Sequence, residues 1–354
     1  MCTSDDAERK VKAARGDPAQ ARKELLEAAE IYLTLSMNAD GREREHLAKA
    51  EELFSEARKI PVPEHVHAPA ARRGLTFKDI GGLSALKEEI RFKIIEPLLH
   101  PEVYAHYGKK AGGGILLYGP PGCGKSLIAE ATAGEAKAAF FHVKPSNIKS
   151  KYVGEAERNI AELFRAAREQ QPSIIFFDEF ETLGAERGET AANERGAIAQ
   201  LLAETDGMGA KGQQVLLLAA TNEPWSVDLA LQREGRFGAT VFVPAPDSEA
   251  RKEIFKIHLA GKPLSRDIRG EELLVMTEGF SGADIKAVCE KAADIPLREY
   301  FRTGEMRPLH MADFLSALKG HRSVVGQWLA KARREMGSRN ALEQYPELTC
   351  GAAP

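Results

Sequence analysis

The sequence has no apolar run that approaches the roughly 20 residues needed for a membrane-spanning helix. Its first residues lack the basic and apolar regions of a secretory signal peptide. The four cysteines are scattered, without metal-ligand spacing or a disulfide framework, which predicts a reducing, cytoplasmic compartment. A formal net charge of −3 gives no reason to expect a nucleic-acid surface. We therefore expect a cytoplasmic protein without membrane insertion and without a nucleic-acid partner.

What the sequence does contain changes in character along its 354 residues. It opens with helical periodicity and continues into a stretch with several prolines, which is typical of a linker. Short apolar runs that alternate with helical stretches follow, and beyond Pro244-Ala-Pro246 only helical periodicity remains. We expect a helical N-terminal domain, a linker, a large α/β domain, a helical lid domain and a tail without assigned structure, in residues 1–60, 61–75, 76–246, 247–336 and 337–354.

The middle of the chain predicts a parallel β-sheet with helices on both faces, because its apolar runs are short and separated by helical segments. The five runs are Ile115–Tyr118, Phe140–Val143, Ile174–Phe177, Val215–Ala219 and Thr240–Val243. The helices expected after the sheet are Glu249–Leu259, Gly282–Ala293, Met311–Leu318 and Val324–Met336. The fold class is therefore α/β, with a five-stranded sheet of the P-loop NTPase kind between two small helical domains.

The first apolar run leads into a glycine-rich loop, Gly119-Pro-Pro-Gly-Cys-Gly-Lys125-Ser126, and then into a helix. A phosphate-binding loop requires this order, because the loop N–H groups and the helix N-terminus both attract the polyphosphate. Lys125 can reach the β- and γ-phosphates, and the Ser126 hydroxyl can hold Mg²⁺. The sequence thus predicts binding of ATP and Mg²⁺. The loop residues expected to contact the nucleotide are Pro121, Gly122, Cys123, Gly124, Lys125, Ser126 and Leu127.

Polar side chains close two further apolar runs. Asp178 and Glu179 follow Ile174–Phe177, where Asp178 can bind the hydration shell of Mg²⁺ and Glu179 can activate a water molecule. Asn222 follows the next run and can hold the attacking water in line. Taken alone, these residues could form a solvated acidic turn and a turn-forming asparagine. Downstream of a phosphate-binding loop, we interpret them as the hydrolytic set.

Two other motifs have both an ordinary and a functional interpretation. Arg233 and Arg236 flank a glycine near the expected sheet edge, where arginines are usually solvated or ion-paired. The alternative is that they reach the γ-phosphate bound by a neighbouring subunit. Lys151, Tyr152 and Val153 follow the second run, and Tyr152 either packs within a loop or grips a polypeptide.

In order and spacing these motifs resemble the AAA ATPases. The resemblance spans about Phe77 to Met336, most of the chain. The segments that carry it are Thr76–Gly82, Gly119–Ser126, Lys151–Glu155, Asp178-Glu179, Asn222, Arg233/Arg236 and Gly279–Asp284. The resemblance implies that Lys125 and Ser126 belong to Walker A, Asp178 and Glu179 to Walker B, and Asn222 to sensor 1.

The same resemblance implies roles that the residues alone leave open. Arg233 and Arg236 become arginine fingers that act on a neighbouring subunit. Lys151, Tyr152 and Val153 become the pore loop, with Tyr152 as its aromatic residue. Contacts with the base and ribose are implied for Asp79, Ile80, Gly81, His258, Gly282 and Ala283.

The chain departs from the family pattern at few positions. Cys123 and Ser126 stand where threonines are usual, and Glu181 replaces a more usual aspartate. The backbone N–H of Cys123 remains available to a phosphate, and its thiol predicts sensitivity to alkylation. Since no catalytic position is lost, we expect an active ATPase.

The subgroup within the family is less clearly marked. Trp225 and Trp328 are similar to the katanin, spastin and ESCRT-disassembly group, whereas the arginine-finger segment looks more like tandem unfoldases and proteasomal ATPases. One ATPase module, no membrane anchor and the absence of a His-Glu-x-x-His motif argue against the membrane proteases and the tandem two-ring unfoldases. Residues 1–60 resemble a MIT domain, although a TPR-like pair or a plain helical spacer fits equally well.

Together these expectations describe a homo-hexameric ring motor promoted by ATP. It would hydrolyse ATP to remodel, disassemble or unfold a protein substrate threaded through its pore. The N-terminal helices would select the substrate or adaptor. The alternatives are a nucleotide-gated scaffold, a proteasome-type unfoldase partner and, disfavoured by the charge balance, a nucleic-acid motor.

Overall fold

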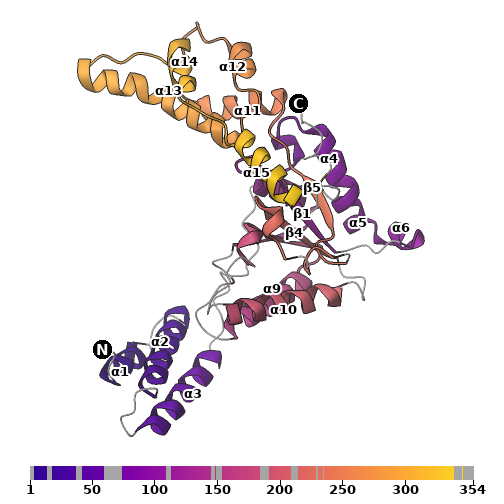
Figure 1. Ribbon diagram of the computed structural model, residues 1–354, viewed down its shortest axis with the longest axis vertical. Helices are drawn as coiled ribbons and strands as arrows, with labels where there is room; N and C mark the ends of the chain where they lie inside the picture. Colours follow the sequence, from indigo (N-terminus) through magenta and orange to yellow (C-terminus); the bar gives the residue numbers. More distant parts are fainter. Residues whose placement is uncertain are drawn as a thin grey trace. The chain divides into compact units, whose positions relative to one another are not determined.

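The computed structural model describes residues 4–13, 18–36, 42–59, 74–108, 113–144, 148, 154–183, 191–208, 214–228, 230–233, 235–338 and 345 (Figure 1). The chain divides into two compact units, Met1–Ala68 and Pro69–Pro354. The boundary falls within the stretch 61–75, where the sequence predicts a linker.

The described part of the N-terminal unit is helical, as expected. It comprises α1 (Ser4–Ala13), α2 (Pro18–Ser36) and α3 (Glu43–Lys59). Leu25 and Tyr32 of α2 and Leu53 of α3 are buried, and the Tyr32 ring stacks on His46 with centroids 5.9 Å apart. The helices thus share a small apolar core, while the MIT-like character of the segment stays a prediction.

Five parallel strands form a single sheet in the order β2-β3-β4-β1-β5. Because β4 lies between β1 and β3, the loops that follow these three strands leave the same edge of the sheet side by side. This edge brings the phosphate-binding loop, the acidic pair and Asn222 together, and the expected α/β fold is confirmed. The strands are β1 (Gly114–Tyr118), β2 (Ala139–Val143), β3 (Ser173–Phe177), β4 (Val215–Thr221) and β5 (Ala239–Phe242).

Two apolar cores lie on opposite faces of the sheet because successive side chains of a strand point to opposite sides. In β4, Leu216 and Leu218 belong to the core beneath α7, whereas Leu217 and Ala219 belong to the core beneath α9 and α10. The helical elements of this domain are η2 (Phe77–Asp79), α4 (Ser84–Ile90), η3 (Arg91–Ile95), α5 (Glu96–Leu99), α6 (Pro101–His106), α7 (Lys125–Glu135), α9 (Glu155–Glu169), η4 (Phe180–Leu183), α10 (Ala191–Met208) and η5 (Pro224–Ser226).

Helices alone follow the sheet: α11 (Ser248–Leu259), α12 (Gly270–Met276), α13 (Gly282–Thr303), α14 (Met311–Lys319) and α15 (Val324–Ser338). All four helices expected here are present, and α12 is an additional short one. The lid core contains residues of α11 to α14 but none of α15. Instead, Trp328 and Met336 of α15 pack in a cluster with Tyr118 of β1 and with Trp225.

The tail from Gly337, to which no structure is assigned from the sequence, begins with the last two residues of α15, and one further residue of it is described. Tyr345 is buried, and its ring centroid lies 4.9 Å from that of Tyr118. Its hydroxyl donates to Oε1 of Gln232 at 3.1 Å. At least this position of the tail therefore packs against the large domain.

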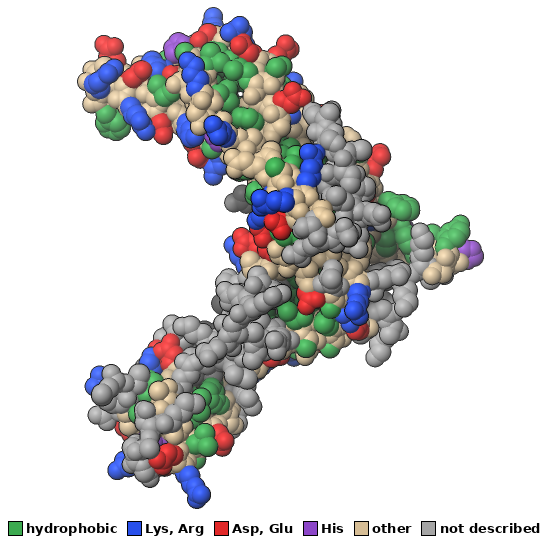
Figure 2. Space-filling view, in the orientation of Figure 1, with side chains coloured by type: hydrophobic (Ala, Val, Ile, Leu, Met, Phe, Trp, Pro, Cys, Tyr) green, Lys and Arg blue, Asp and Glu red, His purple; other side chains and the backbone are tan. Residues whose placement is uncertain are grey.

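Several apolar side chains remain exposed around α6. Phe92, Val103 and Tyr107 are 64, 49 and 77% exposed. Figure 2 shows hydrophobic side chains over this projecting segment, at the right of the view. Such a patch is suited to contact with another surface. No helix in the described residues is long and apolar enough to cross a membrane.

Candidate nucleotide-binding and hydrolysis site

The loop between β1 and α7 depends on glycine for its path. Gly122 and Gly124 have φ of +74° and +85°, a region in which other residues are strained. A Cβ at Gly122 would lie 2.6 Å from Cβ of Ala283, and the Ala283 N–H donates to the carbonyl oxygen of Gly122 at 3.3 Å. Glycine therefore lets the loop turn and also lets the N-terminus of α13 approach it.

Lys125 begins α7 and is only 8% exposed. Its Nζ donates to the carbonyl oxygens of Gly119 and Pro120 at 2.9 and 2.8 Å and to Oδ1 of Asn222 at 2.7 Å. Burial lowers the pKa of the Lys125 ammonium group to about 8. These three acceptors occupy the three N–H donors of the ammonium group but carry no charge, so a polyphosphate in the loop would favour its protonated form.

Ser126 and Asp178 meet beside this lysine. The Ser126 hydroxyl donates to Oδ2 of Asp178 at 2.9 Å. Burial alone would raise the pKa of Asp178, but the His142 imidazole, whose Nε2 lies 3.5 Å from Oδ2, the Ser126 hydroxyl and the Glu179 N–H together lower it. An ionised carboxylate beside a hydroxyl presents the oxygen ligands that Mg²⁺ prefers. The residues present therefore fit the ion that the sequence implies.

Glu179 is exposed and has a φ of +47°, in the left-handed region. This conformation costs a residue other than glycine about 1–2 kcal/mol, and such strain often marks functional positions. Asn222 lies across from this segment, with its N–H 3.5 Å from Oε1 of Glu181. Glu181 also raises the pKa of Lys125 against the effect of burial. Glu181 has no role among the expectations from the sequence, although its position two residues after Glu179 is a usable signal.

A cavity of about 370 Å³ lies between the phosphate-binding loop and the lid. This volume is within the range of small-molecule sites. Many of the residues expected to contact a nucleotide line it: Asp79, Ile80, Gly81, Gly122, Cys123, Gly124, Leu127, His258 and Gly282. The other expected contacts, Pro121, Lys125, Ser126 and Ala283, are sequence neighbours of these lining residues.

No Lys or Arg is among the described residues that line the cavity. Burial, with Lys286 and Lys262 nearby, lowers the pKa of His258, which favours its neutral imidazole. The carboxylate of Asp79 accepts hydrogen bonds from the N–H and hydroxyl of Thr76 at 2.7 and 3.1 Å. Asp79 therefore shapes the backbone of this wall through a local capping box. Such a wall suits the base and ribose better than the phosphates.

Cys123 differs from the sequence expectation of a reactive thiol. It is 7% exposed, and burial raises the pKa of its thiol to about 12. Since the thiolate is the reacting species, this environment opposes alkylation. The structure therefore argues against the expected sensitivity to alkylation.

The arginine pair lies apart from the cavity within one chain. Arg236 forms a bidentate pair with Asp206 of α10, through Nε and Nη2 at 2.9 and 2.8 Å, and donates to the carbonyl oxygen of Ala230. Arg233 is exposed, and neither arginine lines the cavity. Their action on a neighbour stays a prediction. The expected pore-loop residues Lys151, Tyr152 and Val153 lie outside the described residues.

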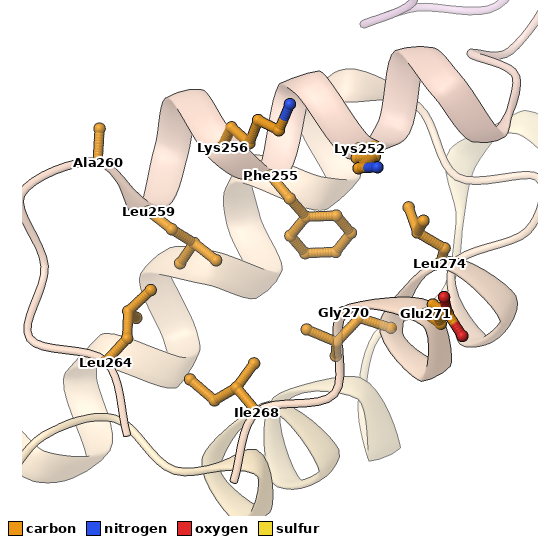
Figure 3. Close-up of a pocket in the computed structure, with 11 residues that line it drawn as sticks. Lys252, Phe255, Lys256, Leu259, Ala260, Leu264, Ile268, Gly270, Glu271 and Leu274 are labelled. Carbon is orange, nitrogen blue, oxygen red and sulfur yellow. The ribbon is translucent and has the colours of Figure 1, made fainter. Parts of the chain in front are cut away.

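A larger cavity of about 560 Å³ lies within the lid (Figure 3). Phe255, Leu259 and Ile268 line it, and Lys252 and Lys256 lie on its α11 side. It contains none of the expected site residues. Among the described residues, no group of three or more His, Cys, Asp or Glu side chains could hold a metal ion. The smaller cavity beside Lys125 is therefore the candidate site.

Comparison with known proteins agrees with this geometry. The chain matches the family model "ATPase family associated with various cellular activities (AAA)" over residues 115–245 and the model "AAA+ lid domain" over residues 267–311. It is 40% identical over 308 residues to the protein named cell division cycle protein 48 homolog of Archaeoglobus fulgidus. It is 41% identical over 247 residues to human ATPase family gene 2 protein homolog A.

These two alignments cover 86 and 69% of this chain but 42 and 28% of the relatives, so the chain spans less than half of their length. A solved structure described as "Crystal structure of FIGL-1 AAA domain" is similar with a TM-score of 0.65 and 30% sequence identity. That similarity covers 74% of this chain and 89% of the FIGL-1 chain. With its parallel sheet, phosphate-binding loop and helical lid, the chain belongs to the AAA ATPase family.

Proposed function

We propose that this chain hydrolyses ATP at the edge of the sheet where β1, β3 and β4 end. The observation that carries the proposal is the convergence of two contacts, Lys125 with Asn222 and Ser126 with Asp178. They join the phosphate-binding loop to the ends of β4 and β3. Such a constellation serves to position phosphates and neutralise their charge.

Each residue of this edge has a distinct role. Lys125 binds the β- and γ-phosphates with its ammonium group, while Ser126 and Asp178 hold Mg²⁺. When bound, Mg²⁺ neutralises the charge that develops on the phosphate oxygens. Glu179 accepts a proton from the attacking water, and the Asn222 amide orients that water. Release of the present bond between Lys125 and Asn222 frees both side chains for these roles.

The nucleoside binds in the adjoining cavity. The backbone around Asp79, Ile80 and Gly81 forms one wall, and His258 forms part of another. Gly282 and Ala283 lie at the start of α13, close to Gly122. Since these residues come from the large domain and the lid, bound nucleotide would contact both.

We further propose that the ATPase drives a protein-remodelling ring. Arg233 and Arg236 would act on the nucleotide of an adjacent copy, since they lie apart from the cavity of their own chain. Tyr152, with Lys151 and Val153, would grip the polypeptide in a central pore. The N-terminal helices would select a protein substrate or adaptor in the cytoplasm. The relationship to a cell division cycle protein 48 homolog supports this class of activity.

The test is ATP turnover as a function of protein concentration. Specific activity should rise steeply with concentration for the unaltered chain. Glu179→Gln and Arg236→Ala should each be inactive while still binding ATP, and mixing them should restore part of the activity. Arg298→Ala, which alters an exposed lid arginine, is the matched control and should behave as the unaltered chain. Specific activity independent of concentration and of Arg236 would exclude the ring, although not ATP hydrolysis itself.

A further inference from the structure

The two tryptophans of this chain lie together although they are distant in sequence. Trp225 belongs to η5, directly after the Asn222 loop, and Trp328 belongs to α15. Their ring centroids are 6.0 Å apart, and both side chains are buried. The last helix of the described chain therefore packs against the loop that follows β4.

Polar contacts fix this helix to the loop at two further points. Trp328 donates from Nε1 to the backbone carbonyl oxygen of Asn222 at 2.6 Å. Lys331, about one turn later, pairs with Oε1 of Glu223 at 2.5 Å and lies 5.4 Å from the Trp225 ring centroid. The helix thus holds three residues of one short loop.

Asn222 lies between this helix and the phosphate-binding loop. Its backbone carbonyl accepts from Trp328, while its side-chain Oδ1 accepts from Nζ of Lys125 at 2.7 Å. A shift of the backbone at this residue would move the amide relative to Lys125. Because positioning errors of about 1 Å can cost 100-fold in rate, the backbone contact bears on hydrolysis.

Contacts near both ends of α15 fix its position. Near its start, the Ser323 hydroxyl donates to the carbonyl oxygen of Gly279 at 2.9 Å and to Oδ2 of Asp284 at 3.0 Å. Towards its end, Met336 packs in the same buried cluster as Tyr118 and Tyr345. The helix therefore connects the lid to the Asn222 loop through ordered contacts.

We propose that Trp328 is a positioning residue for ATP hydrolysis. By holding the Asn222 carbonyl, it fixes the backbone from which the Asn222 amide orients the water that attacks the γ-phosphate. Lys331 supports the same loop through Glu223. This inference rests on the role proposed above for Asn222.

Trp328→Phe tests the proposal because it keeps an aromatic ring and removes the N–H donor. We expect kcat to fall about fivefold, the value of one lost hydrogen bond. KM should stay within about twofold, as should the ATP dissociation constant measured by calorimetry in a Glu179→Gln background, because no nucleotide contact is lost. The matched control is Tyr345→Phe, which removes a hydrogen bond from the same cluster without touching Asn222 and should leave kcat unchanged.

A double-mutant cycle separates this inference from the role of Asn222 itself. Asn222→Ala should lower kcat at least about tenfold, and adding Trp328→Phe should lower it no further. If Asn222→Ala is fully active, the role proposed for Asn222 fails. If Asn222→Ala is impaired but Trp328→Phe is fully active, or if the two effects multiply, only the positioning role of Trp328 is overturned.

Lys331→Met provides a second variant at an exposed position where folding is not at risk. It removes the ion pair with Glu223 and should lower kcat about twofold with KM unchanged. A thermal unfolding midpoint close to that of Tyr345→Phe would show that Trp328→Phe is folded. A rise in KM without a fall in kcat, in either variant, would contradict the proposal.

Discussion

Lys125 combines burial with the need to bind a highly charged ligand. Burial lowers its pKa to about 8, so the ammonium group is partly deprotonated in mildly alkaline solution. Phosphates would raise this pKa again, since opposite charge favours the protonated form. We therefore predict that ATP binding at pH 8 takes up about half a proton per site. ATP affinity should fall above pH 8, by at most about tenfold per pH unit.

Calorimetry at pH 8 in buffers of different ionisation enthalpy measures this uptake. Ser126→Ala keeps Lys125 and should keep the uptake, whereas Lys125→Met should abolish it. The lowered pKa of Lys125 also determines how the stability of the folded chain depends on pH. Between pH 8 and 10.5 the folded chain binds fewer protons than the unfolded chain, so the destabilisation by Lys125 present below pH 8 is lost as the pH rises through this window. A binding enthalpy independent of buffer would contradict a lowered pKa.

Cys123 provides a second prediction for a single residue. Because burial raises its thiol pKa to about 12, its thiolate is far scarcer at pH 8 than that of an ordinary cysteine with a pKa of about 8.5. Iodoacetamide should modify Cys123 at least about 100-fold more slowly than a free thiol. Mass spectrometry of peptides from timed reactions measures this rate. The chain in denaturant is the control, and rapid modification of the native protein would show that the loop opens.

At the scale of elements, Asp284 connects α13 to the segment between α14 and α15. It caps α13 through the Ser281 N–H and hydroxyl, at 2.9 and 2.8 Å, and accepts from Ser323 and His321 at 3.0 and 2.9 Å. Burial opposes its ionisation, but these hydrogen bonds outweigh burial and lower its pKa. The stabilising contribution of the Asp284 carboxylate is therefore complete at pH values above the ordinary pKa of an aspartate. It is lost as the pH falls through the lowered pKa.

Asp284→Ala should destabilise the protein by about 2–3 kcal/mol, through loss of the cap and of buried hydrogen bonds. For a chain of this size, the unfolding midpoint should fall by about 3–4 °C. Calorimetric or spectroscopic thermal unfolding of the full chain measures the change. Asp294→Ala, on the exposed face of the same helix, should shift the midpoint by less than about 2 °C. Equal effects of the two substitutions would show that the cap contributes little.

The sequence predicts elements well where their signal is local. The strands are apolar runs bounded by polar residues, so all five appear within a few residues of their expected bounds. By contrast, α12 spans only Gly270–Met276, too short for a clear helical period. The prediction ends α13 at Ala293, but the helix continues past Pro296 to Thr303, because a proline can be tolerated where packing supports the helix.

In the site, too, features within one short segment are predictable from the sequence, whereas contacts between separate segments are not. The phosphate-binding loop is contiguous, so its residues are recognisable from sequence. The contacts of His142 with Asp178, Glu181 with Asn222 and Trp328 with Asn222 join separate segments. No spacing rule predicts them, because they depend on strand order and on the return of α15 to the large domain.

At the scale of the whole molecule, a ring of identical copies requires two different surfaces that fit each other. The chain offers the exposed apolar patch around α6 and the exposed segment that carries Arg233. Arg236, however, is bound to Asp206 within its own chain. If it acts on a neighbouring nucleotide, assembly must first break or redirect this pair.

Because Asp206 would compete with a neighbouring nucleotide for Arg236, replacing Asp206 tests the proposed assembly. A surface pair between arginine and carboxylate is worth about 0.2–1 kcal/mol, so releasing Arg236 should favour its contact across the interface by up to about fivefold. Asp206→Ala should therefore lower the protein concentration at half-maximal specific ATPase activity by about two- to fivefold. In an Arg236→Ala background, which is expected to be inactive, the same substitution should leave self-association measured by analytical ultracentrifugation unchanged. Loss of activity in Asp206→Ala, as in Arg236→Ala, would mean instead that the pair holds the arginine in its working position and that assembly proceeds without breaking it.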